Sequence, residues 1–266
     1  MKTYQKNIIL FVILSLCILV YFSKKEKEII VPSTVATTTD IFVNESNEFY
    51  IISARYPKEP RDKDFIMEKD ILTIVNQKKQ EWKIGGPLYN EEKNISARNP
   101  DEPLFLKYEL NIKFDKFESK DKGTVSYVFK NYEFTGGAHG GTGLMTYTFD
   151  KKGLVQAENI LDLNGPNSLA LSKMLRDKLR DKFKVFHGEF YNAEMLDAGL
   201  GLQFIKNDAM SAKVGEDTFN FSLNFKHFVV LDEGITFIFG QYQVAPYVAG
   251  MPEVLMTWKE LKPFLK

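Results

Sequence analysis

The sequence FLKYELNIKF at residues 105–114 places apolar side chains at alternate positions, and TVSYVFKNYEF at residues 124–134 forms a similar run. Alternation with period two is typical of a β-strand with one buried face and one face in water. Both runs are rich in aromatic and β-branched residues, which favour strands, and residues 144–149 add a third run. The centre of the chain therefore predicts an antiparallel sheet with one solvent-exposed face.

Helical patterns flank these strands. Residues 64–82 carry apolar residues at spacings of three, four and seven, and Gly85-Gly86-Pro87 predicts the end of that helix. A second amphipathic helix is predicted to begin at an N-cap at Asn167 or Ser168. Near the end of the chain, Thr257 and Glu260 have the spacing of a capping box, which predicts a last short helix.

Further strand patterns complete the prediction of the fold class. Residues 49–56 form a strand pattern before the first helix, and residues 219–230 and 235–239 flank a tight-turn sequence at 232–234. Strand and helix patterns do not alternate as regular βαβ units. We therefore predict an α+β fold with a mainly antiparallel sheet and two or three packed helices, in two joined sub-domains at residues 46–150 and 151–266.

Residues 1–23 predict a signal anchor or signal peptide, because residues 8–22 are apolar except for one serine and follow two lysines. This run is short against the roughly 20 residues that span a bilayer, so cleavage remains open. No small-x-small site precedes the charged sequence at residues 24–28, which favours a retained anchor. The expected location is the cell membrane, single-pass through residues 8–22, with secretion after cleavage as the alternative.

Residues 24–45 include a stretch rich in Ser, Thr and Pro and are predicted to be a linker. Only seven residues precede the apolar run, so the folded mass is expected to be extracytoplasmic. Removing residues 1–23 takes two lysines from the 35 basic residues and nothing from the 35 acidic ones. Without a basic surplus, nucleic acid is not an expected partner.

Catalytic and metal-binding motifs are incomplete. Cys17 is the only cysteine and lies in the apolar run, which excludes a disulfide or a thiolate metal site in the soluble part. The glycine spacing of residues 136–141 fits a phosphate loop, but Thr142 replaces the lysine and a strand follows. His139 lacks a nucleophile or further ligands to work with. We predict no enzyme activity, no catalytic residue, no metal and no cofactor.

Two loops are the candidate binding elements. Residues 135–143 hold five glycines in nine positions, which indicates a need for backbone freedom. Residues 241–250 present Tyr242 and Tyr247 beside Pro246. Tyrosine gives a large contact area at low entropic cost, which favours a binding loop. The alternative is that both rings pack under the loop and only their hydroxyls reach water.

Three stretches, residues 50–57, 132–140 and 240–250, resemble the extracytoplasmic domain of RsiV-type anti-sigma factors, which is also found before the catalytic domain of PdaC-type peptidoglycan deacetylases. The resemblance covers residues 46–265 and implies a two-part α+β fold. A known member of that family binds lysozyme, through loops that enter the substrate cleft. On this basis the expected binding residues are Thr135, Gly137, His139, Tyr242, Pro246 and Tyr247.

The resemblance implies a membrane-anchored sensor or binding module that recognises lysozyme or another cell-wall-directed protein or ligand. Seven residues before the anchor are too few for a sigma-binding domain, so no sigma factor is expected. No deacetylase domain is expected either, because the chain ends at Lys266. Two alternatives stay open: a hydrolase of cell-wall glycan or peptide centred on His139, and a structural surface protein without a small partner.

Overall fold

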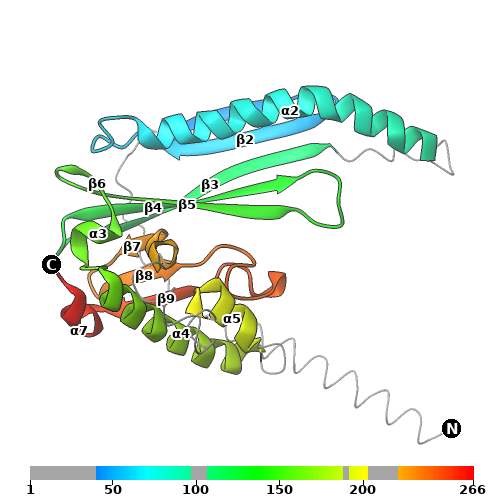
Figure 1. Ribbon diagram of the computed structural model, residues 1–266. Helices are drawn as coiled ribbons and strands as arrows, with labels where there is room; N and C mark the ends of the chain where they lie inside the picture. The colour runs from blue at the N-terminus through cyan, green and yellow to red at the C-terminus, as the bar shows by residue number, and fades with distance from the viewer. Residues whose placement is uncertain (1–39, 97–106, 188–191, 203–220) are drawn as a thin grey trace, which may run out of the picture. The chain divides into compact units, whose positions relative to one another are not determined.

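The computed structural model describes residues 40–96, 107–187, 192–202 and 221–266 (Figure 1). The predicted anchor and most of the predicted linker lie outside the described residues. Within the described part, no helix is both long and apolar enough to cross a membrane. The described residues all belong to one compact unit.

The larger sheet has six strands in the order β1-β2-β3-β4-β5-β6. All neighbouring strands are antiparallel except β2 and β3, which are parallel and are connected through helix α2. A parallel pair needs such a crossover, whereas the antiparallel pairs need only turns. The α+β class is confirmed, and the sheet is mixed. The strands are β1 (Asp40–Ser46), β2 (Tyr50–Pro57), β3 (Tyr108–Ser119), β4 (Thr124–Phe134), β5 (Gly141–Asp150) and β6 (Gly153–Val155).

Helix α2 (Ile66–Ser96) lies along β2 on one side of the sheet (Figure 1). Its Met67, Ile71, Val75 and Trp82 are buried against alternate residues of the strands, as the predicted periodicity requires. The predicted end of this helix at Gly85-Gly86-Pro87 is wrong. A Cβ on Gly86 would lie 2.6 Å from the Cβ of Phe49, so glycine there permits close packing instead of ending the helix.

The predicted linker is too long at its C-terminal end, because Asp40–Ser46 forms strand β1. Ile41 and Val43 pack against the core beneath α2, while Phe42 points to the other face and is 63% exposed. This is the alternation of an edge strand with one buried face. Strand β1 was not predicted from the sequence, because it contains polar residues and follows a Ser/Thr-rich stretch.

The smaller sheet is antiparallel in the order β7-β8-β9 and packs on helix α4. Residues 221–225, predicted as part of a strand, form the 3-10 helix η3 instead. Helix α4 begins at Gly165, two residues before the first predicted N-cap, and the capping box of Thr257 and Glu260 is confirmed. The elements are β7 (Phe228–Val230), β8 (Gly234–Ile238), β9 (Glu253–Thr257), α3 (Ala157–Ile160), α4 (Gly165–His187), α5 (Ala193–Gly199), α7 (Trp258–Leu261), η3 (Phe221–Phe225), η4 (Tyr247–Ala249) and η5 (Lys262–Phe264).

The two sheets share a small apolar cluster of Val128, Val229 and Ile238. The contact is also polar, because Val230 N donates to Ser126 Oγ at 3.1 Å. Strand β6 extends the larger sheet to Val155, past residue 150. The predicted sub-domain boundary near residue 150 stays a prediction.

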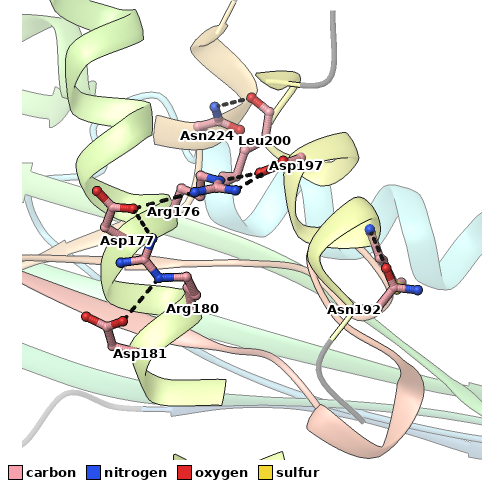
Figure 2. A network of polar contacts seen from close by, with 9 residues as sticks. Arg176, Asp177, Arg180, Asp181, Asn192, Asp197, Leu200 and Asn224 are labelled. Carbon is pink, nitrogen blue, oxygen red and sulfur yellow. Dashed lines mark hydrogen bonds and ion pairs between the residues drawn. The ribbon is translucent and has the colours of Figure 1, made fainter. Parts of the chain in front are cut away.

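A buried ion pair joins helices α4 and α5 (Figure 2). The Arg176 guanidinium meets both carboxylate oxygens of Asp197, with Nη2 3.2 Å from Oδ2. The Asp197 side chain is only 3% exposed. Close by, Asn224 Nδ2 donates to Leu200 O at 3.0 Å and to Ser172 Oγ at 2.9 Å. These contacts hold α5 against α4. Helix α5 also packs closely on the candidate loop at residues 241–250, since Gly199 lies next to Gln243.

Candidate binding surface

The first candidate loop connects β4 to β5, whose last paired residues are Glu133 and Gly141. Gly136 has a φ of 87°, in the region that only glycine adopts readily. Gly140 is buried, and a Cβ there would lie 2.4 Å from the Tyr132 ring. The glycines therefore let this loop turn and then fold closely onto Tyr132.

The second candidate loop connects β8 to β9 and begins with a tight turn. Gln243 N donates to Gly240 O, and Gly240 N donates back to Gln243 Oε1, both at 3.0 Å. Tyr242 within the turn has a φ of 65°, which is rare for a bulky residue. Such strain persists only when surrounding contacts impose it, and it is often found at functional sites. The turn leaves the Tyr242 side chain 52% exposed.

Further along this loop, Pro246 is the N-cap of the 3-10 turn η4, which starts at Tyr247. Proline fixes its own φ and so restricts the direction in which the chain enters the turn. Ala249 N donates to Pro246 O at 2.9 Å, closing the turn. Pro246 thus positions Tyr247, which is 37% exposed.

Three side chains from the two loops form a continuous aromatic surface, defined here as His139, Tyr242 and Tyr247. The ring centroids of His139 and Tyr247 are 4.3 Å apart at an interplanar angle of 32°, and those of Tyr242 and Tyr247 are 5.7 Å apart at 42°. Ring pairs at these separations stabilise one another. The sequence allowed two arrangements of the tyrosines, exposed or packed under the loop. In the structure both tyrosines are exposed.

Hydrogen bonds fasten the two loops together. Tyr247 Oη donates to Gly140 O at 3.4 Å, and His139 Nδ1 lies 3.1 Å from the same oxygen. Thr142 N at the start of β5 donates to Gln241 Oε1 at 3.0 Å. The two loops are therefore held together at the C-terminal end of the glycine-rich segment.

The six predicted site residues fall into three groups. His139, Tyr242 and Tyr247 come together as one surface, and Pro246 positions one of them. Thr135 and Gly137 are exposed on the same glycine-rich loop, and the space beside Gly137 is open, with His139 O the nearest atom to an added Cβ at 3.8 Å. Sequence reasoning missed Gln241 as a contributor, because its role depends on a contact across 99 positions.

A groove of about 490 Å³ adjoins the aromatic surface on the face of the larger sheet that is opposite α2. It includes Tyr132, on which Gly140 packs, and Thr142, which Gln241 contacts. We refer to it as the lysine groove. The groove is lined by Asn111, Lys113, Phe114, Asp115, Lys130, Tyr132 and Thr142.

Asp232, in the turn between β7 and β8, has structural contacts. Asp232 Oδ1 accepts hydrogen bonds from Ser119 Oγ at 2.6 Å and from Asp121 N at 3.2 Å. The Ser119 hydroxyl is the main reason that the pKa of Asp232 is lowered. Throughout the described ranges, no group of three His, Cys, Asp or Glu side chains is placed to hold a metal ion.

His227 lies between the two sheets and is a pH-sensitive element. Its Nδ1 is 3.5 Å from Thr146 Oγ1, and burial lowers its pKa from 6.5 to about 4, with Lys226 adding a smaller effect. The unfolded chain therefore binds a proton below pH 6.5 that the folded chain does not bind until pH 4. Stability from the neutral ring is present above pH 6.5 and is lost as the pH falls towards 4.

We expect the free energy of unfolding to decrease by about 2 kcal/mol across this window through His227 alone, less than the full linkage value because the ring keeps some solvent contact. Urea unfolding at pH 7, 5.5 and 4 measures the slope. In the His227→Gln variant, the free energy of unfolding should change less with pH over this range than in the wild type. Equal slopes for the wild type and the His227→Gln variant would contradict this assignment.

Two family models match separate regions of the chain. Residues 42–142 match the family described as deacetylase PdaC, and residues 165–259 match a family described as protein of unknown function, DUF3298. No curated protein matches the chain.

Among solved structures, a DUF3298 family member from Bacteroides fragilis has 20% identity and a TM-score of 0.54, over 85% of this chain and 92% of that chain. A DUF3298 family protein from Pseudomonas aeruginosa has 16% identity and a TM-score of 0.46, over 87% of this chain and 95% of that one. The Bacteroides structure shares the fold. The chain thus combines a PdaC-like region with a DUF3298 region, which confirms the family resemblance predicted from its sequence.

Proposed function

We propose that this chain is a membrane-anchored, extracytoplasmic binding module that recognises a macromolecular partner through the aromatic surface. The observation that carries the proposal is the joining of His139, Tyr242 and Tyr247 from two loops about a hundred positions apart, with both tyrosines exposed. The matches to the PdaC and DUF3298 families support a cell-wall-related role.

Physical properties of the surface favour binding over chemistry. Tyrosine rings bury a large area with few rotatable bonds, and they are enriched among the residues that dominate interface energies. The strained turn at Tyr242 and the hydrogen bonds to Gly140 fix the rings before a partner arrives. A site held in its bound geometry loses less entropy on association.

The proposed partner is a lysozyme-like protein. This choice rests on the resemblance to RsiV-type domains, in which loops enter the lysozyme cleft. Three neighbouring rings, with both tyrosines exposed, supply an aromatic contact surface that such a cleft could accept.

Replacing Tyr247 tests the surface directly. Tyr247 contacts both other rings, so the Tyr247→Ala variant is expected to weaken binding of hen lysozyme by at least about tenfold. Calorimetric titration of the full chain in detergent gives the affinity. The control is Phe42→Ala, which removes an even more exposed ring from strand β1 and should bind as the wild type does.

Two results would count against the proposal. Absence of heat from the wild-type chain at about 100 μM protein would exclude lysozyme as a partner of useful affinity. Turnover of peptidoglycan fragments by the wild type that disappears in the His139→Ala variant would favour the hydrolase alternative.

A further inference from the structure

The lysine groove has an unusual charge arrangement. Lys113 on β3 and Lys130 on β4 are directly opposed in the strand register, on the sheet face away from α2. Like charges facing one another across strands are destabilising. Asp115 compensates for one of them, since its Oδ2 lies 3.3 Å from Lys130 Nζ.

Lys113 is the uncompensated member of the pair. It is exposed, and among the residues that the structure describes no carboxylate forms an ion pair with it. An anion bound beside it would relieve the repulsion across the strands. The groove is thus complementary to a ligand with a single negative charge.

Besides Phe114, the lining includes side chains that can contact hydroxyl and amide groups. Asn111 offers both a donor and an acceptor, Thr142 a hydroxyl, and Asp115 a carboxylate that accepts from hydroxyls. Tyr132 adds an aromatic ring at the side nearest the glycine-rich loop. We propose that the lysine groove binds a carboxylate-bearing saccharide, with Lys113 pairing the carboxylate and the other side chains contacting the sugar hydroxyls.

Other ligand classes fit less well. An added peptide strand needs a free sheet edge, but β4 is paired on both sides along this groove, and β3 is paired with β4 throughout and with β2 as far as Ile112. Bidentate recognition of phosphate favours arginine forks, and no arginine lines the described groove. Asp115 further disfavours a polyanion. The volume of about 490 Å³ is in the usual range for small-ligand sites.

This second site does not depend on the proposed protein partner. The two sites adjoin through Tyr132 and Thr142, so a ligand in the groove would lie next to the aromatic surface. The tests are separate as well, because sugar binding can be measured without lysozyme.

The experiment compares two disaccharides that differ only in the acidic group. N-acetylglucosamine–N-acetylmuramic acid carries a lactyl carboxylate, while the N,N′-diacetyl form of chitobiose has the same ring system and acetamido groups without it. Saturation-transfer NMR on the ligands, with the full chain in detergent micelles, gives the affinity of each. We expect the acidic disaccharide to bind about tenfold more tightly than chitobiose, the size of one charge-assisted hydrogen bond.

The Lys113→Gln variant should reduce binding of the acidic disaccharide by about tenfold and leave chitobiose unaffected. Lys259→Gln, which removes another exposed lysine away from the groove, is the control and should bind as the wild type does. Equal binding of the two disaccharides, an unchanged affinity in Lys113→Gln, or competition by inorganic phosphate at equal concentration would each overturn the proposal. Thermal unfolding of each variant confirms that it is folded.

Discussion

Replacing Asp197 with alanine is expected to lower the free energy of unfolding by about 3 kcal/mol, because it leaves the Arg176 guanidinium without its partner in a largely buried position. The Arg176 side chain is 23% exposed and also lies 3.6 Å from Asp177, so the loss should be at the lower end for a broken buried pair. Urea unfolding monitored by circular dichroism measures the change.

The control for this substitution is Asp181→Ala. Asp181 pairs with Arg180 on the surface of α4 and is 70% exposed, so its removal should change stability by no more than about 0.5 kcal/mol (Figure 2). The double variant Arg176→Met with Asp197→Leu should recover most of the stability, since no unpaired charge remains. A loss below about 1 kcal/mol for Asp197→Ala would mean that the pair is solvated and not buried.

Adding one methyl group at Gly199 should disturb both stability and binding. A Cβ there would lie only 1.8 Å from Gln243 O, a main-chain atom that cannot move by a simple side-chain rotation. We expect Gly199→Ala to cost about 3 kcal/mol and to displace the turn that holds Tyr242. Affinity for the partner should decrease even though Gly199 has no place on the aromatic surface.

Gly85→Ala is the matched control, because Gly85 is also helical and no atom lies within 4 Å of its added Cβ. Alanine there should stabilise the protein by about 0.5–1 kcal/mol. Thermal unfolding and calorimetric titration of both variants provide the comparison. Wild-type stability and affinity in Gly199→Ala would show that the contact with the turn is loose.

Strands with one buried face could be predicted from the sequence because alternation is a local signal. Residues 124–134 were predicted as a strand and form β4 with the same bounds. Strand β1 was missed because its pattern is short and polar, and it becomes a strand through pairing with β2. The end of helix α2 was predicted wrongly at the glycine pair. Gly86 is needed for close packing against Phe49, which is 37 positions away in the sequence, so no local pattern shows its role.

The candidate site was only partly predictable for the same reason. Composition alone identified the loops at residues 135–143 and 241–250 as candidate binding elements. Their meeting depends on the link between Thr142 and Gln241 and on the close approach of Gly140 to Tyr132, and neither leaves a local pattern. The lysine groove required the register of β3 and β4, which sets Lys113 opposite Lys130.

The left-handed backbone of Tyr242 also has a kinetic consequence. A ring already fixed in its docking position does not have to search for it during an encounter, so closely related partners should be captured at similar rates. Their differences in affinity would then appear in how long each complex survives. Under the proposed function, the aromatic surface would discriminate between partners by residence time.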